Sequence, residues 1–277
     1  MVNEEVLAAL LTSAALWLAV GPASGRTSPE EIPPSARIFW IGVLAGLALL
    51  TKLSGVLVLA AIASSWLISG WKKKQIRDAV GPVLLLCAVA GVIGGWFYLR
   101  NFFLYGYFYP QDLELHSIMF EMPPGDRGLR DYLFIPLATW TDPQLLNTDL
   151  LASVWGSTYA TLYFDGQRHF LPDSATISQI GTGLLVLGLL PLLAFVIGFL
   201  RELLRTVRGT LSPQLPLVLL TLFSIAGYIL FTYNNPWFAT LKASYLMGLS
   251  LPFAWWSSQE IARWLSRPGI LRWTMAL

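Results

Sequence analysis

Long apolar segments separated by short polar stretches dominate the chain. One apolar region, residues 38–70, is too long for a single membrane crossing and is interrupted at Thr51 to Gly55, so it predicts two short helices joined by a tight turn. The other runs long enough to cross about 30 Å of hydrocarbon lie near 4–20, 80–99, 178–200, 213–232 and 243–265. Together, the pattern predicts seven membrane helices.

One long polar stretch, residues 101–177, separates these apolar segments into two groups. It follows an aromatic-rich segment at 94–110, which is typical of a helix that leaves the membrane at the headgroup level. An unstructured connection rarely exceeds about 12–15 residues, so this loop is expected to be partly folded, with short helices within 126–138 and 145–163. The chain therefore divides into helices at 1–100, a loop at 101–177 and helices at 178–277.

Composition and charge define the class and the orientation. The chain has 277 residues, of which 55% are hydrophobic and only 12% are charged. A soluble domain carries about 25% charged residues, so this is an integral membrane protein in a lipid bilayer. Its net charge of +2 gives no indication of nucleic-acid binding.

Loops rich in Lys and Arg stay in the cytoplasm. Such clusters occur at Lys72, Lys73, Lys74 and Arg77, at Arg201, Arg205 and Arg208, and at Arg263, Arg267 and Arg272.

If these clusters are cytoplasmic, residues 101–177 lie on the extracytoplasmic side of the membrane. Their nine acidic residues against three arginines agree with that side. We therefore predict an all-α, polytopic protein of the cytoplasmic (inner) membrane, with about seven transmembrane helices and one large extracytoplasmic loop.

Several single charges then fall near the outer headgroup level. An ionisable group in the apolar layer costs about 2–3 kcal/mol on insertion scales, so it is usually kept for a partner or a ligand. The cations could together hold an anion such as a lipid phosphate or diphosphate; alternatively, each side chain extends to water. The residues concerned are the acids Glu4 and Glu5 and the cations Lys52, Arg100 and Lys242.

The loop offers a second group of candidates. Asp112 and Glu114 lie closest to the aromatic segment and could serve in acid–base chemistry, although acids spread over a long loop are also typical of a solvated surface. Trp140 and Trp155 provide flat aromatic faces that suit either a sugar ring or the membrane interface.

No cofactor or metal site is indicated by the sequence. The only two histidines, His116 and His169, lack a zinc-binding spacing, and the single Cys87 excludes a disulfide framework. A divalent cation held by loop carboxylates stays open. Nucleotide-binding and serine-nucleophile motifs are also missing, so ATP-driven chemistry is unsupported.

Three stretches resemble the multi-pass GT-C glycosyltransferases, especially the relatives of protein mannosyltransferases and lipid A aminoarabinose transferases. They are 46–55 (GLALLTKLSG), 95–106 (GWFYLRNFFLYG) and 241–246 (LKASYL). Residues 2–10 are similar to the start of a middle helix in such proteins. Relatives often carry an Arg-Tyr pair before the final helix, where this chain has Ser244-Tyr245.

The resemblance implies transfer of a sugar from a polyprenyl-phosphate donor to an acceptor at the outer face of the cytoplasmic membrane. It implies donor-phosphate contacts from Lys52, Arg100 and Lys242, and an auxiliary acidic role for Glu4 or Glu5. The catalytic base of the family lies in a first outer loop that would precede Met1. The chain is therefore expected to be a C-terminal portion, and whether it is an enzyme by itself stays open.

Two other function classes are weighed against this one. An O-antigen ligase or polymerase would also have a large outer loop, and it would depend on the loop arginines Arg127, Arg130 and Arg168. A transporter would show broken helices in equivalent positions of two repeats, whereas only the break at Lys52 is found. A non-catalytic scaffold is the remaining alternative.

Overall fold

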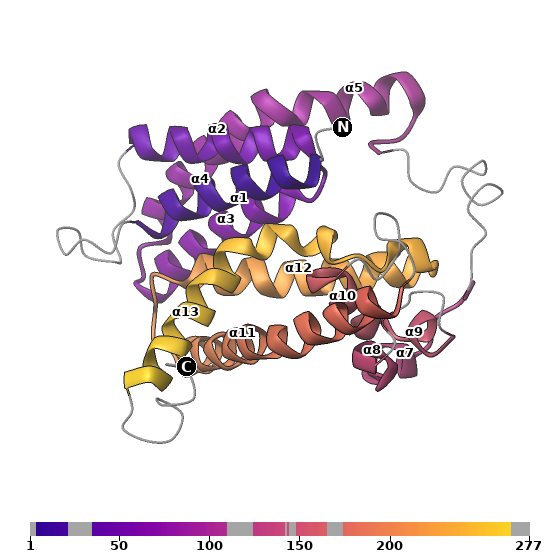
Figure 1. Ribbon diagram of the computed structural model, residues 1–277. Coiled ribbons are helices and arrows are strands. Elements are labelled where there is room, and N and C mark those ends of the chain that lie inside the picture. The colour runs from indigo at the N-terminus through magenta and orange to yellow at the C-terminus, as the bar shows by residue number, and fades with distance from the viewer. Residues whose placement is uncertain are drawn as a thin grey trace. The chain divides into compact units, whose positions relative to one another are not determined.

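A computed structural model describes residues 4–21, 35–109, 124–141, 143, 148–164 and 174–266. Within these ranges the secondary structure is helical, apart from one isolated β-bridge between Pro124 and Trp237, which confirms the all-α prediction (Figure 1). The first group of helices is α1 (Glu4–Val20), α2 (Ser35–Thr51), α3 (Gly55–Lys72), α4 (Ile76–Ala90), the π-helical η1 (Gly91–Gly95) and α5 (Trp96–Tyr105). The described part of the polar loop contains α7 (Leu129–Leu133), α8 (Ala138–Thr141), α9 (Thr148–Ala152) and α10 (Val154–Tyr163). The last group is α11 (Ala175–Val207), α12 (Leu215–Asn234), the 3₁₀ turns η2 (Phe238–Thr240) and η3 (Ala243–Leu249), and α13 (Ser250–Ser266).

The protein is a multi-pass membrane protein. Among the described residues, four helical segments are long and apolar enough to cross a bilayer: α3, the continuous segment Ile76–Tyr105, α11 and α12. The apolar helix α2 is shorter. The last predicted span, 243–265, consists of the η3 turn followed by the 17-residue α13, which carries Glu260 and Arg263. Seven crossings therefore stay a prediction.

The chain forms two compact units. Unit 1 comprises Met1–Pro110, Ala194–Ile225 and Met247–Leu277, and unit 2 comprises Gln111–Leu193 and Ala226–Leu246. The long helices α11 and α12 each contribute residues to both units. The predicted parts 1–100, 101–177 and 178–277 describe membrane topology, which contacts between helices do not test.

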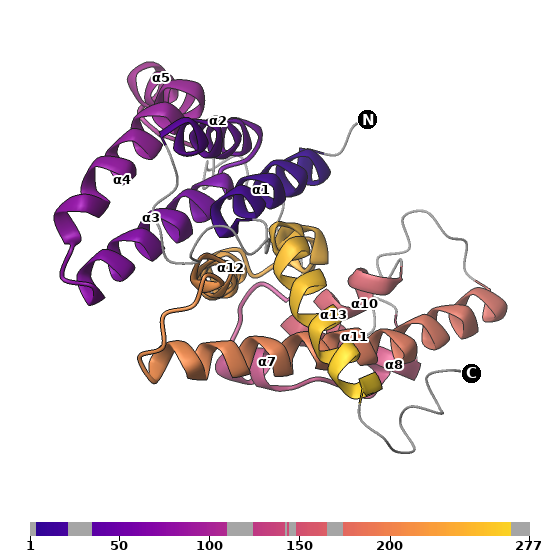
Figure 2. The same cartoon turned by 90° about the vertical axis from the view of Figure 1, so that its left-hand side faces the viewer.

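Unit 1 is built on close approaches between the helices α1 to α5, which lie together in both views (Figures 1 and 2). A Cβ added to Gly94 would lie 2.3 Å from the carbonyl oxygen of Gly46, so α2 and η1 meet at backbone distance. Small residues allow such contacts between membrane helices. A Cβ at Gly55 would lie 2.3 Å from the backbone nitrogen of Leu49. The tight turn predicted between Thr51 and Gly55 is confirmed, because α2 ends at Thr51 and α3 begins at Gly55.

Unit 2 is held by aromatic rings and neutral hydroxyl groups. One cluster joins Val154, Tyr228 and Leu241, and a second joins Tyr159, Phe164 and Leu185. The hydroxyls of Thr158 and Tyr228 share a hydrogen bond of 2.7 Å. The Tyr159 hydroxyl donates to the Leu185 carbonyl, which fastens α10 to the first part of α11. The short helices α7 to α10 confirm that the described part of the polar loop is folded.

Candidate functional site

The structure joins two of the candidate residues from the sequence. The Nζ of Lys52, in the turn between α2 and α3, lies 2.8 Å from Oε1 of Glu5, in the first turn of α1. The two side chains are only 16% and 15% exposed. Water screens such a pair poorly, so it is stronger than a surface ion pair. Both residues also make a further contact, so neither depends on the other alone.

Helix α5 lies beside this pair. The hydroxyl of Tyr98 donates to the carbonyl of Leu49 at 2.8 Å, three residues before Lys52. This contact brings the C-terminal part of α2 next to α5. Arg100 is exposed two residues further along, with Nη1 3.4 Å from Oδ1 of Asn101. Lys52 and Arg100 therefore belong to the same end of unit 1.

The remaining candidates do not join this group in the described geometry. Glu4 is exposed at the start of α1. Lys242 is half-buried between η2 and η3 and belongs to unit 2, so the joint site of three cations stays a prediction. Asp112 and Glu114 lie outside the described residues.

The two candidate tryptophans of the loop take part in packing. Trp140 lies against Tyr159, with ring centroids 6.1 Å apart, and Trp155 lies against Tyr228 at 5.9 Å. Both are half-buried. Their hydrophobic contacts stabilise unit 2, and the structure gives no separate indication that they bind a sugar.

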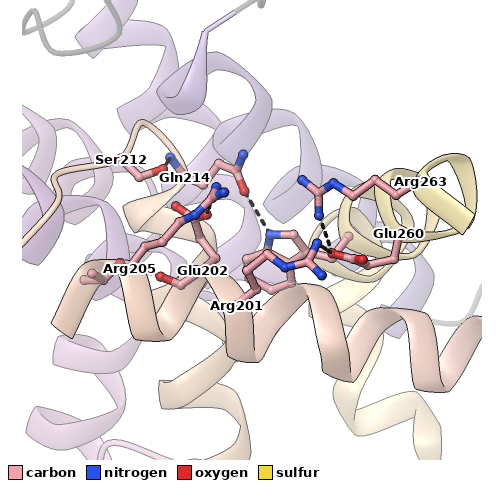
Figure 3. A network of polar contacts seen from close by, with 9 residues as sticks. Arg201, Glu202, Arg205, Ser212, Gln214, Glu260 and Arg263 are labelled. Atoms are coloured by element: carbon pink, nitrogen blue, oxygen red, sulfur yellow. Dashed lines mark hydrogen bonds and ion pairs between the residues drawn. The ribbon is translucent and has the colours of Figure 1, made fainter. Parts of the chain in front are cut away.

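A polar network in unit 1 was not predicted from the sequence (Figure 3). Glu260 of α13 is completely buried and accepts hydrogen bonds from Arg201 of α11 and from Arg263, one turn further along α13. On α11, buried Glu202 accepts from Arg205 at 3.4 Å. In the sequence, these arginines indicated only the orientation of the helices in the membrane. The spacing of three residues within each helical pair was the available signal.

A hydrogen bond also joins α13 to the residue just before α12 (Figure 3). The indole Nε1 of Trp256 donates to Oε1 of Gln214 at 2.9 Å, and the backbone nitrogen of Gln214 donates to the hydroxyl of Ser212 at 3.1 Å. Every polar group in this pair of contacts is neutral. In the charged part of the network, arginines neutralise a buried carboxylate. Both parts join helices of unit 1, so we interpret the network as structural.

Arg127 in unit 2 is a second feature that composition could not reveal. Only 8% of its surface is exposed. Its Nη1 lies 3.4 Å from the carbonyl oxygen of Leu151 and its Nη2 lies 3.5 Å from that of Trp237. Burial lowers the pKa of the Arg127 guanidinium, and the nearby Tyr132 and Asp131 act in the opposite direction. In contrast, Arg130, three residues later, is exposed and lies over the Phe134 ring at 5.6 Å.

Metal ligation finds no support in the described residues, where no group of three or more His, Cys, Asp or Glu side chains is placed to hold an ion. His116, His169 and Arg168 lie outside those residues.

No family model matches the chain, and comparisons with curated proteins and with solved structures also found no match. The functional interpretation therefore depends on the geometry of unit 1 and on the resemblance of the three short motifs.

Proposed function

We propose that this chain is part of a GT-C-type membrane glycosyltransferase that binds a polyprenyl-phosphate sugar donor at the outer face of the cytoplasmic membrane. The observation that supports the proposal is the pair of Lys52, which the resemblance associates with donor-phosphate binding, and Glu5, a candidate for the auxiliary acidic role. An acceptor would receive the sugar from the same face.

The distribution of charge within unit 1 supports the orientation. Helix α3 begins three residues after Lys52 and ends at Lys72, and its 18 residues span about 27 Å, close to the thickness of a bilayer core. At its far end Lys72 reaches the backbone of Thr206 near the end of α11, 3.5 Å away. This end is rich in lysine and arginine, which favours the cytoplasm. The Glu5–Lys52 end then faces outward, as the seven-span topology requires.

The chemistry of the pair suits a phosphate ligand. An ammonium group offers three N–H donors and a full positive charge, and Arg100 at the same end offers a planar fork for phosphate oxygens. When no donor is bound, Glu5 neutralises Lys52. A phosphate would replace the carboxylate as the partner of Lys52, so binding exchanges one ion pair for another without leaving the cation uncompensated. The catalytic base is not assigned to any residue of this chain.

Binding of undecaprenyl phosphate to the purified full chain in phosphatidylcholine nanodiscs tests the proposal. We expect Lys52→Met to weaken binding by at least about thirtyfold, because truncating one partner of a shielded charge pair costs about 2 kcal/mol or more. The matched control is Lys72→Met, at the opposite end of α3, which should bind as the unmodified protein does. Equal binding by Lys52→Met and the control would refute the proposed donor site.

Glu5→Gln separates a ligand site from a structural ion pair. Since the carboxylate competes with phosphate for Lys52, its neutralisation should tighten binding of undecaprenyl phosphate. A purely structural pair predicts no change or a loss of binding.

A further inference from the structure

Arg127 combines deep burial with weak partners. The two carbonyl contacts of its guanidinium, at 3.4 and 3.5 Å, are longer than the usual 2.7–3.2 Å of an N–H···O hydrogen bond. Its Nε is buried and has no hydrogen-bond partner among the described residues. A guanidinium has five N–H donors. Two carbonyl contacts leave most of that capacity unused.

One acidic side chain near Arg127 is engaged in a different contact. Asp131 lies four residues further along, and its Oδ2 accepts from the backbone nitrogen of Gly128 at 2.9 Å, which caps α7. It forms no ion pair with Arg127 in the described part of the chain. Because a buried charge without an ionic partner is costly, proteins usually pair such a group or reserve it for a ligand.

The segments around Arg127 are held in place by contacts with α12 and the segment that follows it. The β-bridge between Pro124 and Trp237 aligns the segment before Arg127 with the segment after α12. Tyr132 is anchored to α12, since its hydroxyl lies 3.0 Å from that of Thr232. Lys242, five residues after Trp237 in the chain, is a further cation of unit 2.

We propose that Arg127 is the centre of an oxyanion-binding site in unit 2 that takes a phosphate-type group. A phosphate presents several acceptor oxygens and a negative charge, which match the unused N–H donors and the uncompensated charge of the guanidinium. The group is either a lipid-linked phosphate headgroup or free phosphate. The argument for this site uses residues of unit 2 alone and does not depend on the proposed glycosyltransferase activity.

Ligand-dependent thermal stability tests the site. The full chain is purified in phosphatidylcholine nanodiscs and its unfolding midpoint is measured with inorganic phosphate, with undecaprenyl phosphate, and with chloride at equal ionic strength. A ligand that binds only the folded state raises the midpoint, so the unmodified protein should be stabilised by at least one phosphate probe. A response to inorganic phosphate identifies a soluble oxyanion as sufficient. A response to undecaprenyl phosphate alone identifies a lipid-linked headgroup if Lys52→Met retains it, because Lys52 belongs to the other proposed site for this lipid.

Two variants attribute the response to Arg127. Arg127→Met should abolish the stabilisation that phosphate binding at Arg127 provides. The apparent affinity for the phosphate probe should fall at least about thirtyfold. Arg130→Met is the matched control, because it removes the same charge from an exposed position three residues away, and it should respond as the unmodified protein does. If Arg127→Met fails to fold, Arg127→Lys decides, since lysine keeps the charge and loses the planar fork. Its apparent affinity should fall about tenfold.

The proposal is overturned if the unmodified protein responds to neither phosphate probe. It is equally overturned if the Arg127 variants respond as strongly as Arg130→Met. The Glu5–Lys52 site gives a different result, because Lys52→Met should leave the Arg127-dependent response in place. Failure of one site is thus distinguishable from failure of the other.

Discussion

In unit 1 the buried carboxylate of Glu260 accepts hydrogen bonds from two arginines, whereas in unit 2 the buried guanidinium of Arg127 reaches, among the described residues, only the carbonyl oxygens of Leu151 and Trp237. Both charged groups are more than nine-tenths buried. They differ in whether an opposite charge is present. A neutralised charge can serve the fold, whereas a charge without an ionic partner lowers stability unless a ligand supplies one.

The pair of Glu5 and Lys52 lies between these two cases. It is neutralised internally, as Glu260 is, but both side chains keep about 15% of their surface exposed, so a ligand can reach them. The comparison predicts that the same kind of substitution, from a charged residue to methionine, has very different consequences in the three places.

The largest effect is expected for the double variant Arg201→Met/Arg263→Met. Without either arginine, Glu260 becomes a buried carboxylate without a cation, and the free energy of unfolding should fall by about 3–5 kcal/mol. Thermal and denaturant unfolding in detergent micelles would measure it. The control is the exposed double variant Arg77→Met/Arg208→Met, and unfolding of both doubles at the same midpoint would show that the network contributes nothing to the fold. Either single variant should lose less, because each arginine is more than a third exposed and the other remains.

Lys52→Met should lower the free energy of unfolding by a smaller amount, about 1–2 kcal/mol. The substitution leaves Glu5 partly buried and without this cation. Adding Glu5→Gln to Lys52→Met should recover part of the loss, because no charge is then left uncompensated. A double-mutant cycle on the free energy of unfolding measures the coupling. Additive effects of the two substitutions would contradict a functional ion pair.

Tyr159→Phe should lower the free energy of unfolding by about 1 kcal/mol, since the buried hydroxyl donates a hydrogen bond to the Leu185 carbonyl. Burial raises the pKa of Tyr159 to about 12, above its ordinary value of 10.0. The folded state therefore holds the phenolic proton more tightly than the unfolded chain. This contribution is complete below pH 10 and is lost between pH 10 and 12. Unfolding midpoints of the two proteins should converge over that range, and a constant difference would contradict it.

The smallest change is expected for Arg127→Met without any added anion. Removal of a buried cation that has no ionic partner in the described part of the chain should leave the free energy of unfolding within about 1 kcal/mol of the original value, or raise it. Denaturant unfolding in chloride buffer would measure this, next to Arg130→Met. A marked destabilisation by Arg127→Met alone would assign Arg127 to the fold and would remove the contrast between the two units.

Local pattern was enough to predict the helices and the turn between α2 and α3. Helix length and apolar character determine where a membrane segment forms, and the break at Thr51 to Gly55 marked the turn directly. The pairing of charges could not be predicted in the same way. Lys52 and Glu5 are 47 residues apart, and Arg201 and Glu260 are 59 apart, so each pair depends on how the helices pack.

The contrast between Arg127 and Arg130 shows the same limit within one loop. Both arginines lie in similar polar sequence, and only the contacts of Arg127 with Leu151 and Trp237 show that one is buried and the other exposed. The division into two units is a further property of contacts, because α11 and α12 each read as one uninterrupted apolar run.

The separation of 47 residues between Glu5 and Lys52 has a consequence for biosynthesis. A ribosome adds about 5–20 residues per second, so Glu5 is synthesised roughly 2–9 s before Lys52. During this interval the Lys52 ammonium does not yet exist to pair with the Glu5 carboxylate. The pair can therefore form only after the turn between α2 and α3 has been synthesised, so α1 depends on a later part of the chain for this contact.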